Sequence, residues 1–259
     1  MKIAFNKYQG TGNDFIMIDN RGGTFPKKDT RLVHRLCDRR FGIGADGLIL
    51  IERDKISDFV MVYYNSDGNP GSMCGNGGRC AVAFAKSLEL IGDETLFMAA
   101  DGPHRATINP DGTISLQMKD VDKIEDREGN WFLDTGSPHH VQMVQALKKF
   151  PVFAEGSRIR NEVYGREGSN VNFVEPAGAG IFSVRTYERG VEDETLSCGT
   201  GATAVALAMH AAGKTDSQTV TVLVPGGKLT ISFEAVRKKY TNIRLAGPAE
   251  FVFEGTIEQ

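Results

Sequence analysis

The chain has 259 residues, of which 41% are hydrophobic and 24% charged, with a formal net charge of −3. This length suits roughly two domains of ordinary size. The absence of a basic excess or a long apolar stretch argues against nucleic-acid and membrane partners. The polar opening residues do not resemble a secretion signal, so we expect a cytoplasmic protein.

The predicted elements alternate short strands with a few helices. In the first half we expect strands at 2–8, 14–19, 48–52, 59–65, 96–100, 105–108 and 114–118. An amphipathic helix capped by Asp29 is expected to run through Arg39. In the second half we expect strands at 131–134, 141–144, 171–174, 181–187, 219–224, 228–233, 240–245 and 250–253.

One short motif occurs twice. Cys74-Gly-Asn-Gly and Cys198-Gly-Thr-Gly each open a glycine-rich turn that leads into a run of small and apolar residues. The helices expected at 80–85 and 202–212 are apolar almost all round, which predicts burial on every side. A thiol at a helix N-terminus lies near the positive end of the helix dipole, which lowers its pKa.

Each cysteine motif follows a strand and precedes a helix, a strand and a hairpin, so one structural unit occurs twice. We therefore predict an α+β protein with two similar domains, residues 1–118 and 119–248. The strand within 249–259 could return to the first domain. In each domain a curved mixed sheet is expected to wrap around the apolar helix, whose N-terminus faces a cleft between the domains.

Four cysteines occur in the chain, Cys37, Cys74, Cys80 and Cys198. Their irregular spacing forms neither a disulfide framework nor a Cys-x-x-Cys metal motif. We therefore expect reduced thiols and no metal.

Two cysteines at helix N-termini suit a two-base racemase or epimerase. The first N–H groups of the helices could hold a carboxylate and stabilise the charge that develops when an α-proton leaves. The thiolate of one domain would take that proton and the thiol of the other would return one to the opposite face, so no cofactor is required. For either cysteine alone, a buried structural role is the alternative.

Other polar side chains suit an amino-acid ligand. Arg189 offers a bidentate clamp for a carboxylate and Glu188 an acceptor for an ammonium group, although a solvated ion pair is the alternative. His139, beside a turn, could tune a nearby thiol or be a surface or hydrogen-bonded histidine without a role. Five amides beside turns or strand ends could also contact such a ligand, although each alone is typical of a turn: Asn13, Asn65, Asn76, Asn170 and Asn172.

Together these motifs resemble the diaminopimelate epimerase family. The resemblance is carried, in the family's order, by residues 10–15, 41–47, 64–68, 73–79, 138–139, 187–190, 197–201 and 225–227. It implies two pseudo-symmetric domains, each a barrel-like mixed sheet around a central helix, with the active site between them. It also implies a homodimer that interconverts LL- and meso-diaminopimelate without a cofactor, in lysine and peptidoglycan biosynthesis.

The resemblance implies a role for each site residue. Cys74 and Cys198 are the base and acid pair. The reacting carboxylate is bound by Gly75, Asn76, Gly199 and Thr200. The ammonium groups and the distal, non-reacting centre are held by Asn13, Asn65, Asn170, Glu188 and Arg189. The pKa values of the thiols are adjusted by His139 and Glu188.

Three positions depart from the family pattern. Ser137 stands where some members have Asn before Pro-His, and Gly47 stands where some have Gln after Ala-Asp. The stretch 190–197 is one residue longer than the usual form. These departures concern contacts with the distal end of the substrate rather than the two thiols.

Three other functions stay open. A racemase acting on proline or hydroxyproline would use the same two-thiol chemistry. A thiol redox enzyme would use Cys74 and Cys198 as a disulfide couple, although such enzymes usually carry Cys-x-x-Cys. A non-catalytic amino-acid binder would tolerate the loss of both thiols.

Overall fold

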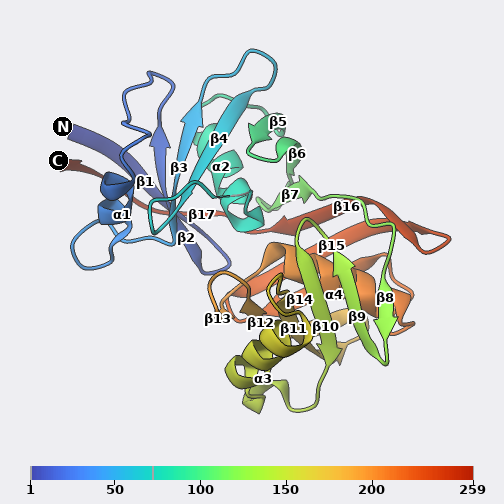
Figure 1. Cartoon of the computed structure of the whole chain (residues 1–259). Coiled ribbons are helices and arrows are strands. Elements are labelled where there is room, and N and C mark those ends of the chain that lie inside the picture. Colours follow the sequence, from blue (N-terminus) through green and yellow to red (C-terminus); the bar gives the residue numbers. More distant parts are fainter. Residues whose placement is uncertain (1, 72, 259) are drawn as a thin grey trace. The chain divides into compact units, whose positions relative to one another are not determined.

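The computed structural model describes residues 2–71 and 73–258 and forms two compact units (Figure 1). Unit 1 comprises Met1–Leu116 and Gly247–Gln259, and unit 2 comprises Gln117–Ala246. None of the helices described is both long and apolar enough to cross a membrane.

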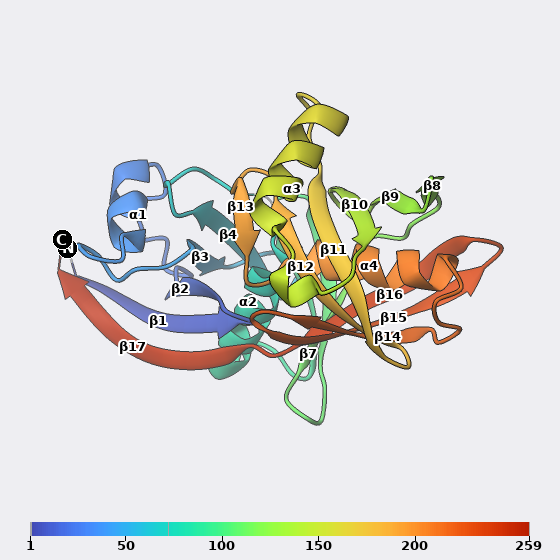
Figure 2. The ribbon, with the colours of Figure 1, turned by 90° about the horizontal axis from the view of Figure 1, so that it is seen from below.

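The described part of unit 1 contains the helices α1 (Thr30–Cys37) and α2 (Gly75–Ser87). Its strands are β1 (Lys2–Gly10), β2 (Asn13–Asp19), β3 (Gly47–Glu52), β4 (Phe59–Asn65), β5 (Glu94–Ala99), β6 (Gly102–Ile108), β7 (Ile114–Gln117) and β17 (Glu250–Glu258). The last strand, β17, pairs antiparallel with β1 along its length and lies beside it in Figure 2.

Unit 2 contains the helices α3 (Val152–Arg158) and α4 (Gly199–Ala211), with a 3₁₀ turn η1 (Leu147–Lys149) and a π-helical turn η2 (Ile159–Val163). Its strands are β8 (Glu125–Arg127), β9 (Asn130–Asp134), β10 (Pro138–Met143), β11 (Asn170–Gly178), β12 (Ile181–Glu188), β13 (Asp193–Thr195), β14 (Thr219–Val224), β15 (Gly227–Val236) and β16 (Lys239–Gly247).

The two units repeat one strand order. In unit 1 the order is β1-β2-β3-β4-β5-β6-β7, and in unit 2 it is β9-β10-β11-β12-β14-β15-β16. In both, the second and third strands and the fourth and fifth strands pair parallel, while the other neighbours pair antiparallel. The helices α2 and α4 occupy the same place in this order, so the predicted duplication is confirmed.

Each central helix is buried inside its own sheet, as its all-round apolar sequence predicts. The helix α2 contacts β1, β2, β3 and β4, and α4 contacts β9, β10, β11, β12, β14 and β15. Val205, Leu207 and Met209 of α4 are fully buried. Each such side chain contributes about 1.5–3 kcal/mol by leaving water. The predicted fold class, a mixed sheet wrapped around a central helix in each half, is confirmed.

The helix predicted to run through Arg39 ends earlier, at Cys37. Asp38 adopts an extended conformation with φ −63° and ψ 127°. Its carboxylate accepts hydrogen bonds from the N–H groups of Arg40 and Phe41, both at 2.7 Å. An aspartate that bonds to nearby backbone in this way competes with the helix and ends it.

Candidate active site

Both cysteines of the repeated motif lie at the N-cap of a central helix. Cys74 precedes α2 with φ −112° and ψ 125°, and Cys198 precedes α4 with φ −121° and ψ 112°. The first N–H groups of a helix have no acceptor within the helix, and the helix dipole is positive there. Cys74 is half-buried and Cys198 is buried. The two sulfurs therefore occupy equivalent positions, next to groups that favour a negative charge.

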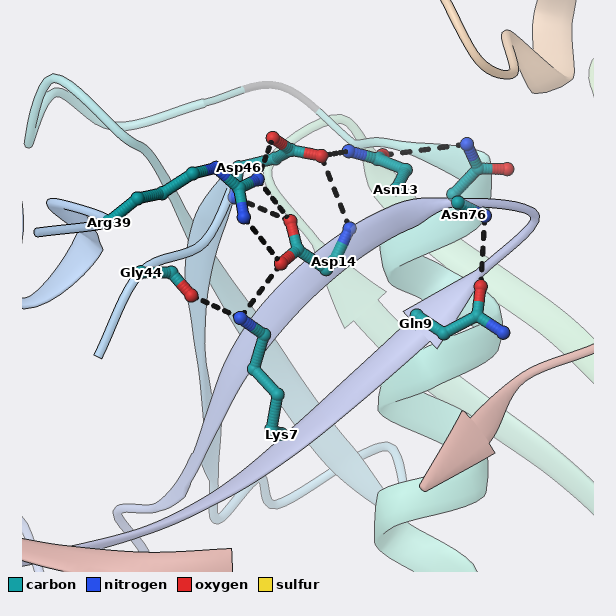
Figure 3. Close-up of polar contacts among 9 residues, drawn as sticks. Lys7, Gln9, Asn13, Asp14, Arg39, Gly44, Asp46 and Asn76 are labelled. Atoms are coloured by element: carbon teal, nitrogen blue, oxygen red, sulfur yellow. Dashed lines mark hydrogen bonds and ion pairs between the residues drawn. The ribbon is translucent and has the colours of Figure 1, made fainter. Parts of the chain in front are cut away.

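In unit 1, the Cys74 sulfur faces the amide of Asn13. The Asn13 nitrogen donates to Asp46 Oδ2 at 2.5 Å, so its carbonyl oxygen points the other way (Figure 3). That oxygen lies 3.6 Å from Cys74 Sγ and accepts from Asn76 Nδ2 at 3.4 Å. The structure thus brings together three residues predicted from the sequence, Asn13, Cys74 and Asn76. It adds Asp46 to that set.

A network of charges holds Asp46 and the start of β2 (Figure 3). Arg39 donates to Asp46 Oδ1 and to Asp14 Oδ1, both at 2.7 Å, and Lys7 lies 2.8 Å from Asp14 Oδ2. Lys7 also donates to the carbonyl oxygen of Gly44. Burial alone would raise the pKa of Asp14, but the hydrogen bonds from Arg39 and Lys7 outweigh it and lower that pKa to about 2. Asp14 is therefore ionised, and the network is fixed by ion pairs.

In unit 2, the Cys198 sulfur faces a backbone N–H group and a hydroxyl group. The N–H of Gly201 donates to Cys198 Sγ at 3.4 Å, and Thr200 Oγ1 lies 3.5 Å from the same sulfur. Thr200 Oγ1 lies 3.4 Å from Ser137 Oγ, which in turn lies 3.1 Å from His139 Nε2. A line of two hydroxyl groups therefore joins the imidazole to the thiol.

His139 is fully buried in unit 2. Burial lowers the pKa of its imidazole to about 3; the charge of Asp134 opposes this by a smaller amount, and the charge of Arg189 lowers the pKa further. The ring is therefore neutral near pH 7, and its Nδ1 lies 3.2 Å from Asn172 Nδ2. The prediction that His139 acts on a thiol is compatible with this geometry only through the hydroxyl groups of Ser137 and Thr200, not through a positive charge.

Of the other predicted residues of unit 2, Asn170 contacts this line directly, and the backbone of Arg189 contacts Asn170. Asn170 donates to Ser137 Oγ at 3.1 Å and to Pro138 O at 3.3 Å, and its Oδ1 accepts from the Arg189 N–H at 2.9 Å. The Arg189 side chain donates to the carbonyl oxygen of Glu167 at 2.9 Å. Glu188 Oε2 accepts from the Thr195 hydroxyl at 3.0 Å.

Asn65 has a different setting. It is exposed at the end of β4, where its N–H donates to Asn69 O and its carbonyl oxygen accepts from Gly68 N–H, both at 2.9 Å. Among the contacts of the described residues, Asn65 thus belongs to a turn rather than to the Asn13 network.

Asn13 and Ser137 occupy equivalent positions in the two units, which was not predicted from the sequence. Phe15 pairs with Gly47 in unit 1, and His139 pairs with Asn170 in the matching parallel pair of unit 2. Asn13 lies two positions before Phe15, and Ser137 lies two positions before His139. The signal was present as Thr-Gly-Asn at 11–13 and Thr-Gly-Ser at 135–137. In both turns the glycine has a positive φ, 86° and 111°.

The remaining cysteines, Cys37 and Cys80, are buried away from any helix N-terminus. Burial raises the pKa of each thiol to about 12, so both stay protonated near pH 7. Within residues 2–71 and 73–258, no three His, Cys, Asp or Glu side chains gather as a metal site.

Comparison with solved structures identifies the fold. A PhzF-family phenazine biosynthesis protein of Bacillus anthracis matches with a TM-score of 0.79 at 14% identity, covering 100% of both chains. A hydroxyproline epimerase from Agrobacterium vitis matches with a TM-score of 0.70 at 16% identity, covering 99% of this chain and 92% of the other. At such low identity the likeness concerns the fold alone.

Sequence comparison is more specific. The family model described as diaminopimelate epimerase matches residues 5–124 and 131–252. A curated diaminopimelate epimerase of Flavobacterium psychrophilum is 62% identical, over 97% of this chain and 98% of the relative. Those of Chlorobaculum tepidum and Aquifex aeolicus are 44% and 38% identical, over 96% and 99% of this chain and 98% of each relative. With both units matched, the chain belongs to the diaminopimelate epimerase family.

Proposed function

We propose that this protein interconverts LL- and meso-diaminopimelate by two-base catalysis without a cofactor, with Cys74 and Cys198 as the pair of groups that take and return the proton. The reaction would serve lysine and peptidoglycan biosynthesis in the cytoplasm. The observation that carries the proposal is the equivalent N-cap position of the two thiols, in a chain of this family.

The proposed chemistry inverts one α-carbon of the substrate. The thiolate sulfur takes the α-proton, and the electron pair of the broken C–H bond moves into the adjoining carboxylate. The N–H groups at the starts of α2 and α4 would stabilise that developing charge. The thiol of the other cysteine then donates its proton to the opposite face of the carbon. After one turnover the two sulfurs have exchanged protonation states, and the protein is ready for the reverse reaction.

The substrate contacts are proposed from the family resemblance. The reacting carboxylate would lie against Gly75, Asn76, Gly199 and Thr200. The ammonium groups and the distal carboxylate would lie against Asn13, Asn65, Asn170, Glu188 and Arg189. A carboxylate and a guanidinium suit a ligand whose distal end carries both charges. This charge pattern favours diaminopimelate over proline, which has no second charged end.

The family resemblance also leads us to propose a homodimer. An exposed apolar stretch on β17 supports it, since Phe251, Val252 and Phe253 keep 52%, 52% and 44% of their surface exposed. The rings of Phe251 and Phe253 pack edge-on against Tyr8 and Phe5 of β1. Light scattering of the wild type and of Phe251→Glu would test this proposal, with a monomeric wild type as the contradicting result.

Proton exchange tests the proposed reaction directly. Reduced protein is incubated in deuterated water with LL-diaminopimelate, or with proline in a parallel sample, and the α-proton is followed by NMR. We expect loss of the diaminopimelate α-signal together with formation of the meso isomer. Exchange on proline alone would overturn the substrate and keep the chemistry. Exchange on neither would leave the redox and binding functions.

A further inference from the structure

We infer that Ser137 is a positioning residue that completes a one-way chain of hydrogen-bond donors ending on Cys198. At rest Cys198 then carries the thiolate, while Cys74 keeps its proton. The inference rests on the proposed two-thiol function and concerns the sulfurs before substrate binds. It follows from the hydrogen-bonding capacity of each group within its own unit.

The chain starts at Asn172, whose amide orientation is determined by its partners. Its nitrogen donates to the carbonyl oxygen of His140 at 2.8 Å, and a carbonyl oxygen can only accept. Its oxygen accepts from the Thr186 hydroxyl at 3.0 Å. The second N–H of the same amide therefore faces His139 Nδ1, which must be the acceptor.

His139 continues the chain by donating a hydrogen bond to Ser137. A neutral imidazole has one N–H, and because Nδ1 accepts, the proton is on Nε2. Burial keeps the ring neutral by lowering its pKa to about 3. Nε2–H therefore donates to Ser137 Oγ across 3.1 Å.

Ser137 has only one proton to give, and its contacts decide where that proton points. Its oxygen also accepts from Asn170 Nδ2, whose orientation is set because Asn170 Oδ1 accepts from a backbone N–H. With both acceptor positions of the hydroxyl used, its proton is directed to Thr200 Oγ1 at 3.4 Å. The Thr200 proton is then directed to Cys198 Sγ at 3.5 Å.

The Cys198 sulfur consequently receives two donors, the Thr200 hydroxyl and the Gly201 N–H. Hydrogen bonds to the charged form of a group favour that form. The N-cap position at the positive end of the α4 dipole acts in the same direction. These contacts together stabilise a thiolate on Cys198.

The helix dipole acts on Cys74 as it does on Cys198, but the side chain that faces the Cys74 sulfur has the opposite polarity. The Asn13 nitrogen is held by the Asp46 carboxylate, so the group facing Cys74 Sγ at 3.6 Å is the Asn13 carbonyl oxygen. An acceptor there pairs with a protonated S–H. Asn13 is the equivalent of Ser137, so the two halves of the duplication place opposite hydrogen-bonding groups at the same position.

The test measures the ultraviolet absorbance of thiolate in the reduced, substrate-free full chain at neutral pH. We expect Cys198→Ala to lose this absorbance and Cys74→Ala to keep it. Ser137→Ala should lower the ratio of thiolate to thiol given by this absorbance about fivefold, the value of one lost hydrogen bond. It should lower kcat similarly with little change in KM, and Ser137→Thr should restore both. Loss of the signal in Cys74→Ala instead, or an unchanged signal in Ser137→Ala, would overturn the inference.

A second variant keeps the test decisive if Ser137→Ala fails to fold. Thr200→Val removes the last hydroxyl of the chain at nearly equal volume and should lower the ratio of thiolate to thiol by a similar factor. When Ser137→Ala folds, the double variant should be no worse than Thr200→Val alone, because the two groups act in series. The absorbance is measured without substrate, so it can meet these expectations even if the protein does not turn over diaminopimelate.

Discussion

The Arg79 guanidinium is fully buried beside Asn76 and donates from Nη2 to Asn76 Oδ1 at 3.0 Å. It also donates to the Thr11 hydroxyl at 3.3 Å and to the Pro248 carbonyl oxygen at 3.2 Å. Because the arginine can only donate, it turns the amide so that Asn76 Nδ2 faces Asn13. Arg79 therefore orients the first turn of α2 behind the Cys74 thiol and joins it to the returning C-terminal segment.

Replacing Arg79 should cost stability. In Arg79→Lys one ammonium group cannot reproduce the planar fork, so at least one buried acceptor loses its partner. We expect a loss of about 3 kcal/mol in the free energy of unfolding, measured by urea denaturation. Arg31→Ala, an exposed arginine of α1, is the control and should stay within about 0.5 kcal/mol of the wild type. A wild-type unfolding curve for Arg79→Lys would show that the buried fork is dispensable.

Loss of either N-cap thiol should stop the proposed reaction. Cys74→Ala and Cys198→Ala each remove a proton donor or acceptor, a contribution of about 10²–10⁴-fold to the rate. The measurement is the initial rate of meso-diaminopimelate formation from the LL isomer. Cys37→Ala is the control, because that thiol lies outside the site and stays protonated. Full activity in either N-cap variant would contradict two-base catalysis.

Asp14 should make stability depend on acid. Its pKa is about 2 in the folded protein, against an ordinary value of 3.8. Because the folded pKa is lowered, its stabilising effect is complete above 3.8 and is lost as pH falls towards 2. Asp14→Asn should therefore be less stable than the wild type at neutral pH by about 2 kcal/mol, and the difference should shrink through that window.

Denaturation curves at several pH values check the Asp14 prediction. Asp93→Asn, which removes an exposed carboxylate paired with Lys86, is the control, because an exposed ion pair contributes little to stability. A stability difference for Asp14→Asn that stays constant down to the lowest pH would mean that the ion pairs with Lys7 and Arg39 do not carry the effect.

The duplicated fold was readable from the sequence because its signals are local. Cys74 and Cys198 each begin a glycine-rich turn before an all-apolar helix, and both features fall within a few adjacent residues. The link from His139 to Cys198 was not readable. It depends on the parallel pairing of β10 with β11, which brings His139 beside Asn170 across 31 positions of sequence, and on the return of α4 to the same place.

The surroundings of Gly47 likewise depend on strand pairing and could not be predicted from the local sequence. The sequence indicates only that no side chain is present where some relatives have Gln. The structure shows what occupies the space, since a Cβ at position 47 would lie 2.5 Å from Tyr63 Cε2 and 2.6 Å from the Tyr64 carbonyl oxygen. Both tyrosines lie on β4 and are brought next to Gly47 by the pairing of β3 with β4, which no local pattern around Gly47 reveals.

The glycine three residues after each cysteine, Gly77 or Gly201, should respond differently when it is replaced by alanine. A Cβ at Gly201 would lie 2.4 Å from Asn172 Oδ1 and 3.3 Å from Cys198 Sγ. A Cβ at the equivalent Gly77 would meet the ends of flexible side chains, at 3.0 Å from Ile49 Cδ1 and 3.3 Å from Met61 Cε. Alanine otherwise stabilises a helix relative to glycine by up to about 1 kcal/mol, so propensity alone predicts a gain at both sites.

We expect Gly201→Ala to lose activity because the displaced Asn172 amide no longer sets the direction of the His139 hydrogen bonds. Misplacing a group of the site by about 1 Å can lower kcat roughly 10²-fold. Gly77→Ala, as the matched control, should keep most of the activity, because side-chain ends can move by the few tenths of an ångström required. Steady-state rates on diaminopimelate compare the two variants. Equal losses would mean that both glycines serve only the close packing of their helices, and that Asn172 has no directing role at Cys198.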